Sequence, residues 1–144
     1  YEHTGYFNHK YIPRAGATSA QGELNYETNY RAIRYADVLL MAAEANNRKT
    51  SADDVKAQNY LNQVRARAFG NDSKASSSTG VVLTQEIWDE RRLELAMEGQ
   101  RFFDLVRTGE AAAKIEGFVS GKHEVFPIPQ TEIDISGLTQ NSGY

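Results

Sequence analysis

Residues 84–109 constrain the fold most, because their apolar pattern is that of one long helix. Four large apolar side chains share a helical face: Trp88, Leu95, Phe102 and Val106. Thr84 is a suitable N-cap, and Gly109 suits the residue that follows the last helical turn. The sequence therefore predicts a continuous helix from Thr84 to Gly109.

Gly99 stands on the apolar face of this predicted helix. A glycine at such a position destabilises a helix by about 1 kcal/mol relative to alanine. We therefore expect another segment of backbone to pass close to Gly99, where a larger side chain has no room.

The same stretch carries many charges of both signs: Arg91, Arg92, Glu94, Glu98, Arg101, Asp104 and Arg107. Paired carboxylates such as Glu94 and Glu98 occur in glycosidases, where one of the pair needs a raised pKa. Here every carboxylate has an arginine within one turn, which lowers its pKa instead. The pattern therefore favours ion pairs that hold neighbouring helices in register, and we expect no enzymatic activity.

A helix ending near Asn46 is predicted before this stretch, with its N-cap at Asn25, Thr28 or Asn29. Apolar side chains cover most of the circumference of this helix, so we expect it to be buried on more than one side.

Two carboxylates on this first helix, Asp37 and Glu44, need partners if the helix is buried. We expect arginines to fill that role. Arg34 is a local candidate for Asp37, because it lies three residues away on the same helix.

A second helix is predicted from a cap at Ser51 or Asp53 to Gly70, with Arg65 and Arg67 facing outward. Its buried row is Ala57, Leu61, Val64 and Ala68. The short connection makes the two helices antiparallel neighbours, with the size of one tetratricopeptide-type unit.

Six of the eight tyrosines lie within the first 35 residues, and residues 1–14 are predicted to form an extended arm. Tyrosine offers a sugar ring an apolar face and a hydroxyl, so Tyr6 and Tyr11 are candidate ligand residues. The competing interpretation, which we favour, is that these tyrosines pack the arm onto the helices.

Two polar or proline-rich segments are predicted to lie outside helices. Residues 71–80 have a low-complexity composition that predicts a mobile loop. Residues 126–129 are predicted to be extended, because their two prolines remove backbone donors.

The composition excludes several classes of function. The chain has 144 residues, a net charge of −3 and no cysteine, and this charge is far from the basic surface that nucleic acids require. Its three histidines are dispersed and no cofactor motif occurs, so we expect neither a metal nor a cofactor. The length suits a single domain over residues 1–144.

Three stretches resemble the SusD/RagB family. Residues 90–107 are similar to its signature ERRxELxxEGxRxxDLxR, since they read ERRLELAMEGQRFFDLVR. Residues 29–45 resemble the family's RYADVLLMxAEA helix, and residues 126–134 and 138–144 resemble its C-terminal ending. That ending usually has proline where Ser142 stands.

Family members are nutrient-binding lipoproteins on the outer membrane of Bacteroidetes-type bacteria. The resemblance implies non-catalytic binding of a glycan or other nutrient in polysaccharide utilisation, and delivery to a SusC-type TonB-dependent transporter. It implies that this chain is the C-terminal part of a longer cell-surface protein, with its lipid anchor upstream. The matching motif residues would be scaffold: Arg34, Asp37, Glu44, Glu90, Arg91, Glu94, Glu98, Gly99, Arg101 and Asp104.

We therefore predict a mainly α fold, with a tetratricopeptide-like αα-hairpin, a long helix and a small extended or β-hairpin element. Periodicity alone keeps a second function open, a helical-repeat module that binds a protein partner. An exposed concave groove would distinguish such a module.

Overall fold

The computed structural model describes residues 5, 8–12 and 29–144 of the chain. These residues form helices and no strand, so the mainly α prediction is confirmed, whereas the predicted β-hairpin element is absent from them. The arm predicted for residues 1–14 lies largely outside the described part. The chain divides into two compact units, Tyr1–Gly99 and Gln100–Tyr144.

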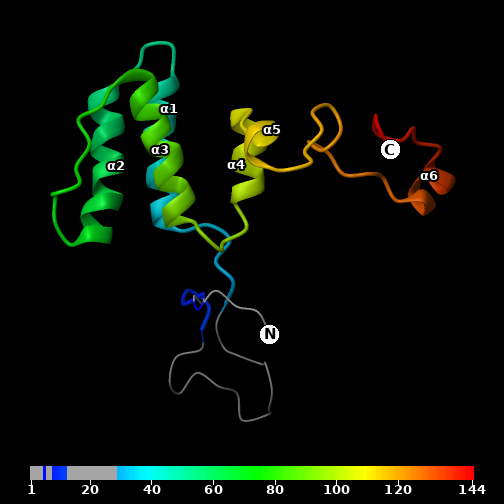
Figure 1. The fold of residues 1–144 in the computed structure, drawn as a ribbon, viewed down its shortest axis with the longest axis horizontal. Helices are drawn as coiled ribbons and strands as arrows, with labels where there is room; N and C mark the ends of the chain where they lie inside the picture. The colour runs from blue at the N-terminus through cyan, green and yellow to red at the C-terminus, as the bar shows by residue number, and fades with distance from the viewer. Residues whose placement is uncertain (1–4, 6–7, 13–28) are drawn as a thin grey trace, which may run out of the picture. The chain divides into compact units, whose positions relative to one another are not determined.

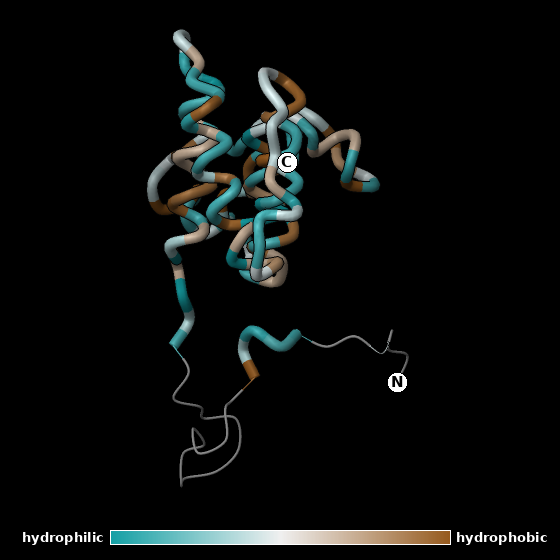
Figure 2. Tube along the Cα trace, turned by 90° about the vertical axis from the view of Figure 1, so that its left-hand side faces the viewer, coloured by the Kyte–Doolittle hydropathy of each residue, from teal (hydrophilic) through white to brown (hydrophobic). Residues whose placement is uncertain are grey.

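The first unit contains a bundle of three helices, α1 (Tyr35–Arg48), α2 (Asp54–Phe69) and α3 (Gly80–Glu94) (Figure 1). α1 and α2 form the predicted αα-hairpin, and α3 packs against both of them. Apolar and hydrophilic segments alternate along the helices (Figure 2), as expected of helices that share a core. That core comprises Leu39, Leu40, Ala43, Ala57, Leu61, Val64, Leu83 and Ile87.

The limits of α2 are those that its end residues predict. The Asp53 carboxylate accepts a hydrogen bond from the backbone N–H of Lys56 at 3.0 Å, which satisfies one donor of the first turn. Gly70 ends the helix with a left-handed φ of 72°, a conformation that glycine adopts without a Cβ clash.

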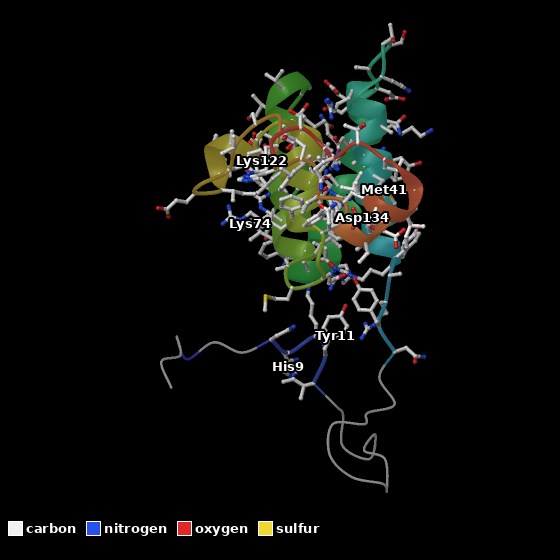
Figure 3. The ribbon with its side chains drawn as sticks, turned by 90° about the vertical axis from the view of Figure 1, so that its right-hand side faces the viewer. His9, Tyr11, Met41, Lys74, Lys122 and Asp134 are labelled. Carbon is white, nitrogen blue, oxygen red and sulfur yellow. The ribbon has the colours of Figure 1, made fainter. Side chains whose placement is uncertain are left out.

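α1 differs from its prediction in two respects. It begins at Tyr35 rather than after Asn29, and the other proposed caps lie outside the described residues. It does pack against two neighbours, α2 and α3, but its apolar surface is not fully covered: residues Val38 and Met41 (Met41 is labelled in Figure 3) are 44% and 45% exposed.

Polar side chains join the helices at one end of the bundle. Asn47, which is buried, donates to a carboxylate oxygen of Asp54 at 2.8 Å and to the carbonyl of Gly80 at 3.1 Å. The other oxygen of Asp54 accepts from the Gly80 backbone N–H at 2.7 Å. These hydrogen bonds, from Gly80 first and then Asn47, lower the pKa of Asp54. One carboxylate on α2 therefore covers the first donor of α3.

The loop between α2 and α3 follows the surface of α2. Asn62 exchanges two hydrogen bonds with the backbone of Ser76, at 3.0 and 2.7 Å. Gln58 donates to the carbonyl of Ser78 at 2.8 Å. These contacts hold the loop against α2, although the sequence predicted that residues 71–80 form a mobile loop.

The long helix predicted from Thr84 to Gly109 is wrong, because it is two helices. α3 begins at Gly80 and ends at Glu94, and α4 (Arg101–Thr108) follows a turn at residues 95–100. The predicted end at Gly109 is confirmed, with a left-handed φ of 77°.

The turn also corrects the explanation of Gly99. A Cβ at this position would have the hydroxyl of Tyr30 as its nearest neighbour, at 3.8 Å, and no backbone within 4 Å. Its φ is 78°, and Met97 has the same left-handed backbone with a φ of 66°. Glycine is therefore favoured here by its backbone conformation rather than by a close approach.

The second unit contains α4, α5 (Ala111–Lys114) and α6 (Gln130–Ser136). Residues 126–129 are not helical, as predicted, and their partners are side chains near the C-terminus. The Gln140 amide accepts from the backbone N–H of Ile128 at 2.8 Å and donates to its carbonyl at 2.9 Å. A single side chain therefore satisfies both polar backbone groups of a residue between two prolines.

Candidate functional site

Four glutamates recur every four residues along α3 and just beyond its end: Glu86, Glu90, Glu94 and Glu98. This spacing places the first three on one face of the helix. Arg65 of α2 bonds the first two, with nitrogen–oxygen distances of 3.1 Å to Glu86 and 2.9 Å to Glu90. The prediction that Arg65 faces outward is therefore wrong.

Glu94 and Glu98 gather cations from three separate parts of the first unit. Arg34, at the start of α1, contacts Glu94 at 2.5 Å and Glu98 at 2.7 Å. Arg67, in the last turn of α2, also pairs with Glu94, while its side chain stays exposed, as predicted. Lys10, from the N-terminal segment 8–12, contacts Glu98 at 2.6 Å. The two carboxylates thus connect both other helices and the N-terminal segment to α3.

The two carboxylates of α1 have the arginine partners that the sequence predicted. Asp37 pairs with Arg91 of α3 at 2.7 Å, and both side chains are buried, with exposures of 9% and 6%. The local candidate for Asp37 was therefore wrong, since Arg34 bonds the glutamates instead. Glu44 pairs with Arg48 of its own helix at 2.7 Å.

The remaining predicted motif residues lie in the second unit. Asp104 of α4 is buried and pairs with Arg107 one turn later, at 2.8 Å. Arg101 is the first residue of the same helix and is exposed.

Of the two ligand candidates, Tyr6 lies outside the described residues and Tyr11 lies in segment 8–12 (Figure 3). The ring of Tyr11 stacks on that of Tyr30, with 6.0 Å between their centroids and 16° between their planes. The hydroxyl of Tyr30 donates to the carbonyl of Glu98 at 3.1 Å, so this pair adjoins the turn after α3.

The surroundings of Glu98 and Glu86 do not suit these two carboxylates to act as general acids. Burial alone would raise the pKa of Glu98, but hydrogen bonds from Arg34 and Lys10 outweigh it and hold the pKa below its usual value of 4.5. Burial is likewise outweighed at Glu86 by Ser78, Ser76 and Arg65, so its pKa is also lowered. A glycosidase acid requires the opposite shift.

Two other features bear on function in the described residues, metal-binding clusters and membrane-spanning helices. In this part of the chain, no cluster of histidine, aspartate or glutamate side chains has the arrangement that holds a metal ion. Its helices also include none with the length and apolar character to cross a membrane.

Glu86, Glu90, Glu94 and Glu98, with the cations that pair with them, form a charged cluster. Sequence reasoning missed several of its members. Lys10, Arg65, Arg67 and Glu86 were not among the predicted motif residues. The four-residue spacing of the glutamates was a usable signal for Glu86. No local signal identifies Lys10, because its contact with Glu98 spans 88 positions of sequence.

The lowered pKa values predict how stability depends on pH. The unfolded chain takes up protons at Glu86 and Glu98 near the usual value of 4.5, whereas the folded chain does so only at lower pH. Their contribution is therefore fully present above pH 4.5 and is lost as the pH falls through the lowered pKa values. Urea unfolding at several acidic pH values measures this loss.

The variant Glu98→Gln isolates one of these groups. We expect its free energy of unfolding to fall less steeply with acidification than that of the wild type. Glu132→Gln, at an exposed position of α6, is the control and should keep the wild-type slope. Equal slopes in all three proteins would contradict the shift at Glu98.

Comparison with known proteins connects this arrangement to a family. The family model described as the SusD family matches residues 1–125. SusD-like protein P2 of Formosa agariphila is 39% identical over 104 residues, which cover 68% of this chain and 20% of that protein. SusD-like protein P25 of the same organism is 31% identical over 139 residues, which cover 83% of this chain and 26% of that protein.

The chain thus spans about a fifth to a quarter of the length of these relatives. The matched residues include both halves of the αα-hairpin, the glutamate row of α3 and the turn that follows it. By sequence over most of its length, this chain belongs to the SusD family.

Proposed function

We propose that this chain is the C-terminal part of a longer outer-membrane lipoprotein that binds a glycan or other nutrient without changing it chemically. The complete protein would face the cell exterior and help deliver its ligand to a SusC-type TonB-dependent transporter. Membership of the SusD family supports this proposal, as does the resemblance of the motifs.

Within that protein, we propose that the motif residues serve mainly as scaffold. The observation that carries this role is the pairing of Glu90 with Arg65, of Glu94 with Arg34 and Arg67, and of Asp37 with Arg91. Each pair joins two different helices of the bundle, so each fixes their relative register. Within the second unit, Asp104 and Arg101 would stabilise α4 itself, where Asp104 pairs with Arg107 of the same helix.

The exposed apolar surface of α1 supports the proposal that this chain is part of a longer protein. Tyr35, Val38 and Met41 lie within two turns of that helix and are 72%, 44% and 45% exposed. A helical repeat leaves such a surface when its neighbour is absent. We propose that further helices of a longer chain cover it, and the second candidate function, a module that binds a protein partner, rests on the same surface.

The first test is a titration of the 144-residue chain against a panel of soluble polysaccharides, with product analysis of the same samples. We expect every polysaccharide to remain intact. Binding that is lost in Tyr11→Ala would place part of the nutrient site in segment 8–12, and the absence of binding would place that site elsewhere in the complete protein. Cleavage would contradict a binding function.

Delivery is tested separately with the complete protein. Purification from outer membranes under mild detergent should recover a TonB-dependent transporter in stoichiometric amount, identified by mass spectrometry. Recovery of the protein without any such transporter would contradict a role in delivery.

A further inference from the structure

In the turn between α3 and α4, side chains take the place of backbone N–H groups as the hydrogen-bond donors to three carbonyls. In a continuous helix, the carbonyls of Glu94, Ala96 and Glu98 would accept from the backbone N–H groups four residues later. Instead, Lys10 donates to the carbonyls of Glu94 at 2.6 Å and Ala96 at 2.8 Å. Arg34 also donates to the Glu94 carbonyl, at 2.5 Å, and Tyr30 to that of Glu98, at 3.1 Å.

These three side chains, Lys10, Tyr30 and Arg34, are called the clamp below. All of them precede Tyr35, the first residue of α1, and each donates to a carbonyl at least 60 positions later in the chain. Two of them are cations, which are favoured at the C-terminal end of a helix by its dipole. The clamp therefore supplies the caps that allow α3 to end at Glu94.

The turn itself is made from residues whose local preference is helical. Leucine, alanine, methionine, glutamate and glutamine are strong helix formers, and residues 95–100 contain all of them. Gly99 alone disfavours a helix. Met97 nevertheless has a φ of 66°, a backbone conformation that is unfavourable for any residue with a Cβ. The local sequence thus favours a continuous helix, whereas the clamp favours the turn.

We propose that the clamp is a conformational latch, and that its release allows residues 84–109 to form one continuous helix. The apolar spacing of Trp88, Leu95, Phe102 and Val106 is already that of such a helix. A continuous helix requires a negative φ at Met97 and Gly99, where the turn has 66° and 78°, so the two states exclude each other. The position of segment 8–12 is thereby coupled to the conformation of the turn: anything that displaces Lys10 favours the longer helix.

The sign of a substitution at Gly99 distinguishes the two states. In the wild-type chain Gly99→Ala places a Cβ at a left-handed position and should lower the melting temperature by roughly 4–8 °C. In the background Lys10→Met/Tyr30→Phe the same substitution should leave the melting temperature unchanged or raise it, because alanine favours the continuous helix. Arg34 is kept, so that its ion pairs with Glu94 and Glu98 still hold the bundle.

Gly109→Ala is the matched control. Gly109 also has a left-handed φ, of 77°, with no atom within 4 Å of an added Cβ, but it follows the end of α4. Its substitution should lower the melting temperature equally in both backgrounds. If the double variant does not fold, Lys10→Met alone provides the background, with a smaller change expected in the same direction.

A second readout locates the change. In the background variants, the 13Cα chemical shifts of residues 96–98 should move toward helical values, whereas those of α2 stay fixed. An equal loss of melting temperature for Gly99→Ala in both backgrounds, or unchanged shifts at residues 96–98, would overturn the latch.

Discussion

Replacing Arg91 with methionine should lower the free energy of unfolding by about 3–5 kcal/mol, because it leaves a buried carboxylate without its charged partner. The Arg91 and Asp37 side chains are 6% and 9% exposed, and their 2.7 Å contact joins α3 to α1. In the variant, Asp37 must either remain charged in a poorly solvated site or take up a proton. Urea unfolding monitored by circular dichroism at neutral pH measures the loss.

The neighbouring Arg92 provides the control, because it is exposed on the same helix. Arg92→Met should change the free energy of unfolding by no more than about 0.5 kcal/mol. The double variant Asp37→Leu/Arg91→Met should recover much of the stability, since neither of these two positions then holds a buried charge. Equal small effects of Arg91→Met and Arg92→Met would show that the buried pair does not hold the bundle.

Truncation of Leu61 to alanine should lower the free energy of unfolding by about 2–5 kcal/mol. Leu61 is fully buried and lies in the core shared by all three helices, so the substitution removes apolar contacts and leaves a cavity. Chemical denaturation followed by tryptophan fluorescence measures the change, because Trp88 lies in the same unit.

Val55→Ala on the same helix is the control for Leu61. Val55 is 69% exposed, so its truncation removes little buried surface, and alanine is the better helix former. We expect a change within about 0.5 kcal/mol. A similar loss for both variants would mean that α2 does not pack through Leu61.

The limits of α2 could be predicted from sequence, because local residues decide them. Asp53 satisfies a backbone donor three residues away, and Gly70 adopts a backbone conformation that glycine tolerates. The buried positions Leu61 and Val64 also follow from the helical period. Each of these features depends only on neighbours within a few turns.

The end of α3 could not be predicted in this way. The residues between Leu95 and Gln100 favour a helix, and their spacing continues the apolar face of α3. What ends the helix is a set of donors from Lys10, Tyr30 and Arg34, which lie far away in sequence. Tertiary contacts here override local preference.

The charged cluster was predictable in kind but not in its pairings. Asp37 and Glu44 on an apolar helix indicated arginine partners, and both have them. For Asp37, the partner that can be read from spacing lies one turn away, whereas the actual partner, Arg91, lies on another helix. Spacing identifies which face of a helix is charged, but not which helix comes to meet it.

The most direct test of a structural role for the carboxylates is one comparison, the wild-type chain against Glu94→Gln/Glu98→Gln. Thermal unfolding and the release of reducing sugar from a polysaccharide panel would be measured on the same samples. If the carboxylates hold the helices in register, the variant melts at a lower temperature, and neither protein releases sugar. Sugar release by the wild type that disappears in the variant would contradict the scaffold and identify the two glutamates as catalytic.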